Sequence, residues 1–148
     1  MDRGTAAILT AGVGCLIALQ APINAGLAKA IGPRQSAFVS FLIGTILLLF
    51  IAAFARGGLA KIADVGHVPA WYYLSGGILG AAYVSTVLVT VKSLGAGPVT
   101  AATVAGQLTA SMVVDQFGLL GVTRSPITAL KLLGVVLLAA GTYLIVRE

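Results

Sequence analysis

Asp115 is the one carboxylate of this chain that lies within an apolar stretch of sequence. The other acids, Asp2, Asp64 and Glu148, lie at the chain ends or in a polar connection. A charged side chain in hydrocarbon is costly, so it usually pairs, loses its charge or takes part in function. Asp115 could therefore carry a proton, act as a gate or headgroup contact, or form an ion pair.

A basic partner for Asp115 is available nearby. The short connection from Gly121 to Pro126 predicts that the apolar stretches on either side form an antiparallel hairpin. Asp115 lies five residues before the end of one stretch and Lys131 four residues after the start of the next, so we expect them at similar depth. An Asp115–Lys131 pair is thus the structural alternative. Burial favours the protonated form of an unpaired carboxyl, which would suit proton-coupled transport.

Other polar side chains share a helix face with Asp115. Steps of three and four residues place them on one side of a helix, and they are Thr100, Thr103, Gln107, Ser111 and Asp115. Serine and threonine hydroxyls can bond to their own helix backbone, whereas glutamine and aspartate cannot easily do so. We predict that Gln107 and Ser111 bind substrate.

Two further apolar stretches carry polar groups. Gln20 and Asn24 lie one turn apart with Pro22 between them, and Tyr83 shares a face with Thr86 and Thr90. We predict that Gln20, Asn24 and Tyr83 also bind substrate. Proline removes a backbone hydrogen bond, so Pro22 is a candidate hinge, as are Gly97 and Pro98 in a later break. Ser36 and Ser40 indicate a packing seam rather than a pore.

These polar groups have two possible roles. Intramembrane amides can simply bond helices together, with modest energies averaging well below about 2 kcal/mol each. Polar faces on three separate stretches favour a shared wet cavity instead. At 1.5 Å per residue, Gln20 and Gln107 lie about 3–4 Å from the middles of their stretches and Asp115 about 8 Å. Tyr83 is similarly central, so the midplane groups are neutral.

The elements that must position these residues are membrane-spanning helices. Hydrophobic residues make up 59% of the chain and charged residues 9%, far from the roughly 25% charged of soluble domains. An apolar run of about 20 residues spans hydrocarbon as a helix. We predict an all-α membrane protein, a single domain of residues 1–148, with five transmembrane helices at Thr5–Ile31, Gln35–Ala55, Ala70–Lys92, Val99–Leu120 and Ile127–Val146. The connection from Arg56 to Pro69 has room for a small surface element.

The basic residues are divided almost evenly between the two sides of the membrane, so they hardly favour one orientation of the protein. One face carries Arg3, Arg56, Lys61, Arg124 and Lys131, and the other carries Lys29, Arg34, Lys92 and Arg147. One explanation is a single orientation weakly set by the loop from Arg56 to Lys61. The other is dual topology, in which an antiparallel homodimer, or a heterodimer with a related chain, forms a ten-helix inverted bundle. We expect such a dimer.

Several functions have no support in the sequence. His67 stands alone and Cys15 is the one cysteine, so we expect no metal site, disulfide or cofactor. No nucleophile has an accompanying base, and no nucleotide-binding fingerprint is present, so we expect no enzyme. The net charge of +5 comes from cations at helix ends, where they suit lipid headgroups rather than nucleic acid. The first apolar run is too long for a removable signal peptide, so we treat it as retained.

Three further motifs stand out in the sequence: Leu19-Gln20-x-x-Ile23-Asn24-x-x-Leu27, Pro69-x-Trp71 with Gly76-Gly77-x-Leu79-Gly80, and Gly106-Gln107-x-x-x-Ser111-x-x-x-Asp115-x-Phe117-Gly118. They resemble the YdcZ-type family of the drug/metabolite transporter (DMT) superfamily. The resemblance implies a five-helix inner-membrane exporter, related to ten-helix metabolite exporters and four-helix multidrug exporters. The four-helix relatives carry a glutamate early in their first helix. This chain has no acid in its first apolar stretch, so the cationic-drug/proton antiport mechanism is not implied.

These observations predict a multi-pass protein of the inner (plasma) membrane. The expected function is that of a secondary-active small-molecule exporter subunit, which works by alternating access. Two alternatives remain: a passive channel for a small ion or neutral solute, and a membrane assembly subunit that transports nothing.

Overall fold

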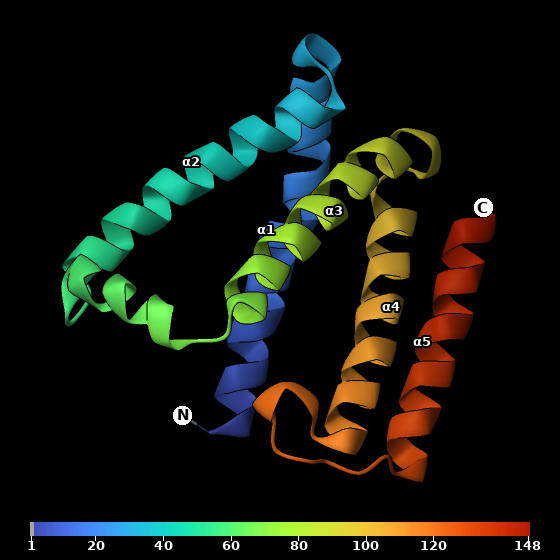
Figure 1. The fold of residues 1–148 in the computed structure, drawn as a ribbon. Helices are drawn as coiled ribbons and strands as arrows, with labels where there is room; N and C mark the ends of the chain where they lie inside the picture. The colour runs from blue at the N-terminus through green and yellow to red at the C-terminus, as the bar shows by residue number, and fades with distance from the viewer. Residues whose placement is uncertain (1) are drawn as a thin grey trace. The chain divides into compact units, whose positions relative to one another are not determined.

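The computed structural model describes residues 2–148, which form helices and connections and contain no β-strand. Each of the five predicted helices is present, with ends within three residues of the prediction. In chain order the elements are α1 (Arg3–Ile31), α2 (Pro33–Phe54), η1 (Gly58–His67), α3 (Ala70–Leu94), α4 (Ala96–Phe117), η2 (Leu119–Gly121) and α5 (Ala129–Arg147), as Figure 1 shows.

Four of the described helices, α1, α2, α3 and α5, are long and apolar enough to cross a membrane. The prediction of an all-α membrane protein is confirmed to this extent. The fourth helix, α4, has 22 residues and so has sufficient length, but its threonines, glutamines and aspartate make it more polar than the other four. Its crossing of the membrane stays a prediction.

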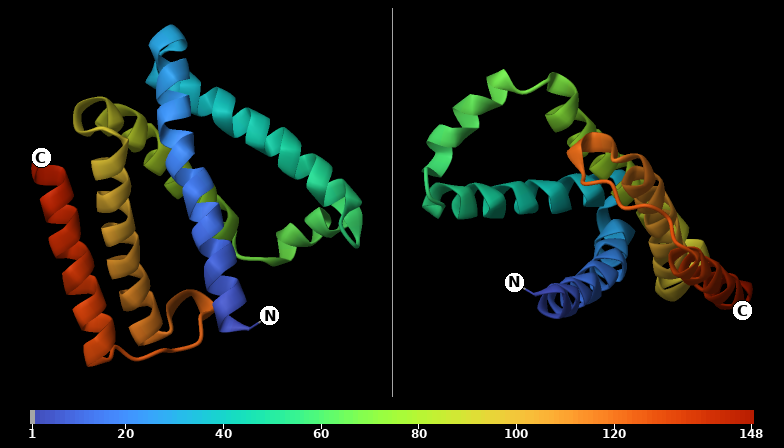
Figure 2. Two further views of the ribbon diagram at one scale, coloured as in Figure 1. Left: turned by 180° about the vertical axis from the view of Figure 1, so that it is seen from behind. Right: turned by 90° about the horizontal axis from the view of Figure 1, so that it is seen from below.

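The chain divides into two compact units, residues 1–92 and 93–148. In the first unit, α1 and α2 form a hairpin around Gly32, whose φ of 92° suits glycine. The two helices meet near this turn and diverge toward their other ends (Figure 2). Ala28 and Ala37, both buried, allow their close approach near the turn.

The third helix packs against this hairpin within the first unit. Val84 and Leu88 of α3 form a small apolar core with Ala37 of α2, and Ala25 of α1 packs against it. Gly80 faces the ring of Phe41 on α2, because a Cβ at Gly80 would lie 3.5 Å from the ring. These contacts hold α3 to the turn end of the hairpin.

The surface element expected between Arg56 and Pro69 is the 3-10 helix η1. A 3-10 helix repeats every three residues, so Leu59, Ile62 and Val65 share one side and all three are exposed. Lys61 and Asp64 repeat on another side. An amphipathic helix of this kind suits the interface between headgroups and acyl chains.

The second unit is an antiparallel helix pair. The chain breaks at Gly95 (φ 83°), and α4 and α5 then run side by side (Figure 1). Two of the candidate hinge residues, Gly97 and Pro98, lie in the first turn of α4. Proline is tolerated there because first-turn amides have no partner within the helix. Pro22 lies inside α1, which continues through it.

Asp2 caps the first helix. Its Oδ1 accepts from the Thr5 backbone N–H at 2.9 Å and its Oδ2 from the Thr5 hydroxyl at 2.6 Å. The hydroxyl bond and then the backbone bond hold the pKa of Asp2 below its ordinary value. Because the folded pKa is depressed, the cap stabilises α1 at neutral pH and is lost as the pH falls through that lowered value.

Candidate functional site

Gln20 borders a cavity between α1 and α2. The cavity has a volume of about 210 Å³ and is also lined by Ser40, Phe41, Gly44, Thr45 and Leu48. Gln20 is exposed and makes no hydrogen bond within residues 2–148. The cavity opens where the two helices diverge, so this predicted substrate residue has space beside it. Sequence reasoning missed Thr45, which also lines the cavity; its hydroxyl donates to the Phe41 carbonyl of its own helix at 2.8 Å.

Asn24 has a different environment one turn further along α1. Its side chain is buried, and its Nδ2 donates to Ser40 Oγ at 3.2 Å. Its backbone carbonyl accepts from Ser36 Oγ at 2.8 Å. Asn24 therefore bonds α1 to α2 in this structure, and Ser36 and Ser40 form the seam that their spacing indicates.

Tyr83 lies with Gln20 and Asn24 at a second pocket, between α1 and α3. Ile17, Ala21, Val84, Val87 and Leu88 complete its walls. The structure thus brings together three of the predicted substrate-binding residues, all from the first unit. The pocket has a free volume of about 10 Å³, which is roughly the room of one water. The larger free volume lies on the α2 side of Gln20 instead.

The predicted polar residues of the second unit lie on α4. Gln107 and Ser111 are exposed, and neither side chain bonds to any other part of residues 2–148. Thr109, two residues after Gln107, instead donates to the Ala105 carbonyl at 2.8 Å. Gln107 lies about 1 Å from the middle of the observed helix by the rise per residue. A central amide on α4 is therefore left for water, a ligand or a partner chain.

Asp115 lies closer to the end of its helix than predicted. Because α4 ends at Phe117, Asp115 lies about 13 Å from the helix middle rather than about 8 Å. Its side chain is half-buried, and its backbone carbonyl accepts from Ser125 N at 2.8 Å. Arg124 Nε donates to the Gln116 carbonyl at 3.0 Å. The linker between η2 and α5, residues 122–128, therefore folds back over the end of α4, next to Asp115.

The ammonium of Lys131 bonds to this linker. Its Nζ donates to Ser125 Oγ at 2.7 Å, to Ser125 O at 3.3 Å and to Pro126 O at 3.1 Å. Within residues 2–148 the structure does not bring Lys131 and Asp115 into an ion pair. The reason is local: α5 begins at Ala129 with Thr128 as its cap, so Lys131 lies in the first turn, from which it reaches back toward the linker.

The contacts of Lys131 lead to a stability prediction. We expect Lys131→Met to lower the free energy of unfolding by about 1–3 kcal/mol, because it removes hydrogen bonds from a charged donor. Chemical unfolding of the purified protein in detergent measures this change. Lys29→Met is the matched control, since Lys29 is exposed in the last turn of α1 and should tolerate the change.

Asp115→Asn tests whether the two residues pair in the membrane. If they do not, the effects of Asp115→Asn and Lys131→Met should add to within about 0.5 kcal/mol. A double variant that loses at least about 1 kcal/mol less than the sum of the two single losses would instead establish the ion pair.

Comparison with known proteins identifies one family. The sequence model of the family described as "putative inner membrane exporter, YdcZ" (DMT_YdcZ) matches residues 5–144. The match includes every residue discussed at this site. No curated protein and no solved structure matches the chain.

Proposed function

The chain belongs to the YdcZ family of inner membrane exporters, and from this premise we propose that it is a subunit of a secondary-active exporter of small molecules. It is a multi-pass protein of the inner membrane, as its family and its apolar helices show. The proposal concerns the mechanism: the helices alternately open a central polar site to each side of the membrane.

The observation that carries this proposal is a pair of central glutamines without protein partners. Gln20 lies about 4–5 Å from the middle of α1 and Gln107 about 1 Å from the middle of α4. Neither side chain bonds to another residue in 2–148. An unsatisfied amide in hydrocarbon costs several kcal/mol, so each must face water, a ligand or another chain. A substrate path supplies water and ligand to both.

The proposal requires that α4 also crosses the membrane. It packs alongside α5 in antiparallel direction, and α5 is apolar enough to span. A helix beside a spanning helix of similar length lies at the same depth. The polar face of α4 then lies inside the protein, which is the usual position of polar residues in membrane helices. Five crossings place the two chain ends on opposite faces.

We further propose that two copies pair in opposite orientations. Cations are nearly balanced between the two helix ends, at five against four, so charge does not select one orientation. Within its own unit, neither central glutamine has a partner. Two inverted copies would enclose a site near the midplane, as in transporters built from inverted repeats.

Labelling of the chain ends tests the orientation. Asp2→Cys and Glu148→Cys, each combined with Cys15→Ala, place a single thiol at one end of the chain. In inside-out vesicles and in intact cells, a membrane-impermeant maleimide should reach each end from both sides. Labelling of each end from one side only would overturn dual topology.

Flux through proteoliposomes tests the transport proposal. Radiolabelled small metabolites and quaternary amines are screened with and without a pH gradient. We expect saturable uptake with counterflow, in which unlabelled substrate inside accelerates entry of label. High flux that does not saturate would identify a passive channel instead. Absence of flux for every compound would favour an assembly role.

A further inference from the structure

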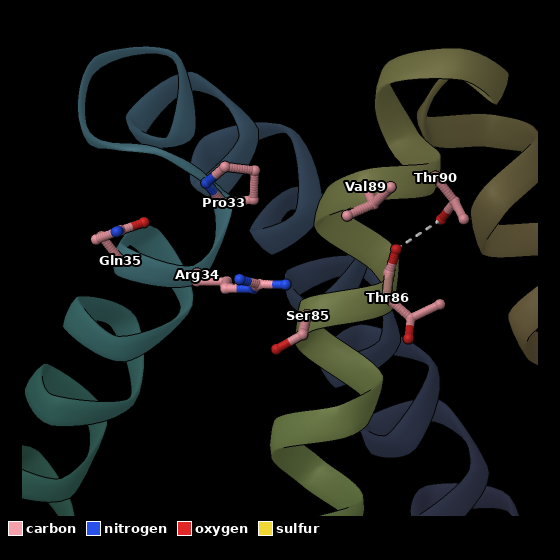
Figure 3. Close-up of a pocket in the computed structure, with 7 residues that line it drawn as sticks. All are labelled: Pro33, Arg34, Gln35, Ser85, Thr86, Val89 and Thr90. Carbon is pink, nitrogen blue, oxygen red and sulfur yellow. Dashed lines mark hydrogen bonds between the residues drawn. The ribbon is translucent and has the colours of Figure 1, made fainter.

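A third and larger cavity lies in the first unit, between α2 and α3. Its volume is about 670 Å³, within the range of small-molecule sites. Its walls come from the first turn of α2 and from two turns of α3, and consist of Pro33, Arg34, Gln35, Ser85, Thr86, Val89 and Thr90 (Figure 3). It shares no lining residue with the cavity beside Gln20.

The guanidinium of Arg34 dominates the chemistry of this cavity. In Figure 3 the side chain extends from α2 across the cavity toward Ser85 on α3. Arg34 is exposed and makes no ion pair or hydrogen bond with residues 2–148. A guanidinium stays charged and offers five N–H donors in a plane that fits a carboxylate or phosphate. An anion in this cavity could therefore accept hydrogen bonds from Arg34 N–H groups that no other residue in 2–148 uses.

The hydroxyls on α3 add one donor to the cavity. Thr86 donates to the Ala82 carbonyl at 2.9 Å and Thr90 to the Thr86 carbonyl at 3.1 Å, so both use their protons on their own helix. The half-buried Ser85 hydroxyl makes no such bond. Ser85 can thus donate to a ligand that Arg34 holds, while Val89 supplies an apolar wall.

Neighbouring charges favour an anion at this position. Lys29 and Lys92 lie in the last turns of α1 and α3, at the same end of the first unit as Arg34. The acids described in this unit, Asp2 and Asp64, lie at its other end, before α1 and after α2. The surroundings of Arg34 thus carry positive charge without a compensating carboxylate, which attracts anions.

We propose that the cavity between α2 and α3 binds an anionic group, a carboxylate or a phosphate, through Arg34 with Ser85 as second donor. It begins in the first turn of α2 and extends about 7 Å along α3 from Thr90 to Ser85. Because the cavity begins at the N-terminal end of α2, it is open both to a free organic anion and to the phosphate of an anionic lipid. The binding chemistry is the same for both sources.

The test measures thermal unfolding of the protein in nanodiscs of two compositions. In phosphatidylcholine alone, citrate and inorganic phosphate are titrated as free anions. In a second series, phosphatidylglycerol replaces part of the phosphatidylcholine without added anion. Stabilisation in the first series identifies a free anion as ligand, and stabilisation in the second alone identifies a lipid headgroup. Stabilisation in neither overturns the proposal.

Variants then assign the effect to Arg34. Arg34→Gln should weaken binding of the stabilising anion or lipid by about tenfold or more, because it removes charge-assisted hydrogen bonds. Arg34→Lys should weaken it less, since the charge remains without the planar donors. Arg56→Gln, which removes an exposed cation after α2, should leave binding unchanged. An equal loss in Arg56→Gln would show general charge attraction and contradict the site.

A chemical readout covers the case in which Arg34→Gln does not fold. Phenylglyoxal modifies exposed guanidinium groups of the unaltered protein, and mass spectrometry follows each arginine separately. The stabilising anion or lipid should slow modification of Arg34 while Arg56 and Arg124 react at their original rates. Equal rates with and without ligand at Arg34 would overturn the proposal.

Discussion

Gln20→Leu and Gln107→Leu should each reduce substrate counterflow in proteoliposomes at least tenfold while leaving the protein assembled. Both amides lie near the middles of their helices without a protein partner. If they bind substrate, leucine removes the hydrogen bonds and leaves polar groups of the ligand unpaired, at a cost of about 1–3 kcal/mol per group. Counterflow rates at subsaturating substrate measure the loss.

The matched control for these substitutions is Thr109→Val on α4. The Thr109 hydroxyl is satisfied at the Ala105 carbonyl, so its loss should change counterflow less than about twofold. Crosslinking in the membrane follows the dimer in all three variants. Loss of the dimer in Gln20→Leu or Gln107→Leu would show that the amides bond helices together. Unchanged flux with an intact dimer would remove them from the substrate path.

Ser36→Leu should destabilise the first unit by about 2–4 kcal/mol. Ser36 is completely buried, and its hydroxyl donates to the Asn24 carbonyl at 2.8 Å. Leucine adds atoms where there is no space, which costs about 1–3 kcal/mol, and it leaves the carbonyl without this bond. Lipid is as apolar as leucine, so added hydrophobicity brings no gain between membrane helices.

Ser36→Ala separates the two parts of this effect. It removes the hydrogen bond without adding volume, so we expect a loss of about 1 kcal/mol. Unfolding in mixed micelles of increasing sodium dodecyl sulfate measures both variants against the unaltered protein. If Ser36→Leu proved as stable as Ser36→Ala, the close contact of α1 with α2 at this position would be wrong.

The different environments of Gln20 and Asn24 could not be predicted from their spacing. Both are amides on one face of α1, one turn apart. Only the angle between α1 and α2 separates them: near the Gly32 turn the helices touch, and Asn24 bonds to Ser40. Toward the other end the helices diverge, and Gln20 borders a cavity. A crossing angle depends on side chains from both helices at once.

The partner of Lys131 depended on a two-residue difference in the start of α5. The sequence predicts that residues 127–128 belong to the helix because they are apolar or uncharged, but Thr128 caps the helix by accepting from Lys131 N at 3.3 Å. The linker before it is held by Gln116, whose Oε1 accepts from Ile127 N at 2.7 Å. This long-range contact determines where the helix begins, and so which acceptors the ammonium reaches.

The sequence by itself determined the membrane class, the five helices and the polar faces of three of them. These properties depend on the residues of one segment, since hydropathy and helical spacing are local. Only the tertiary structure decided which polar groups are consumed in packing, as at Asn24, and which remain free, as at Gln20. It also placed Arg34 opposite Ser85, about fifty residues later. Such pairings depend on how helices cross, and that geometry is set by contacts between distant segments.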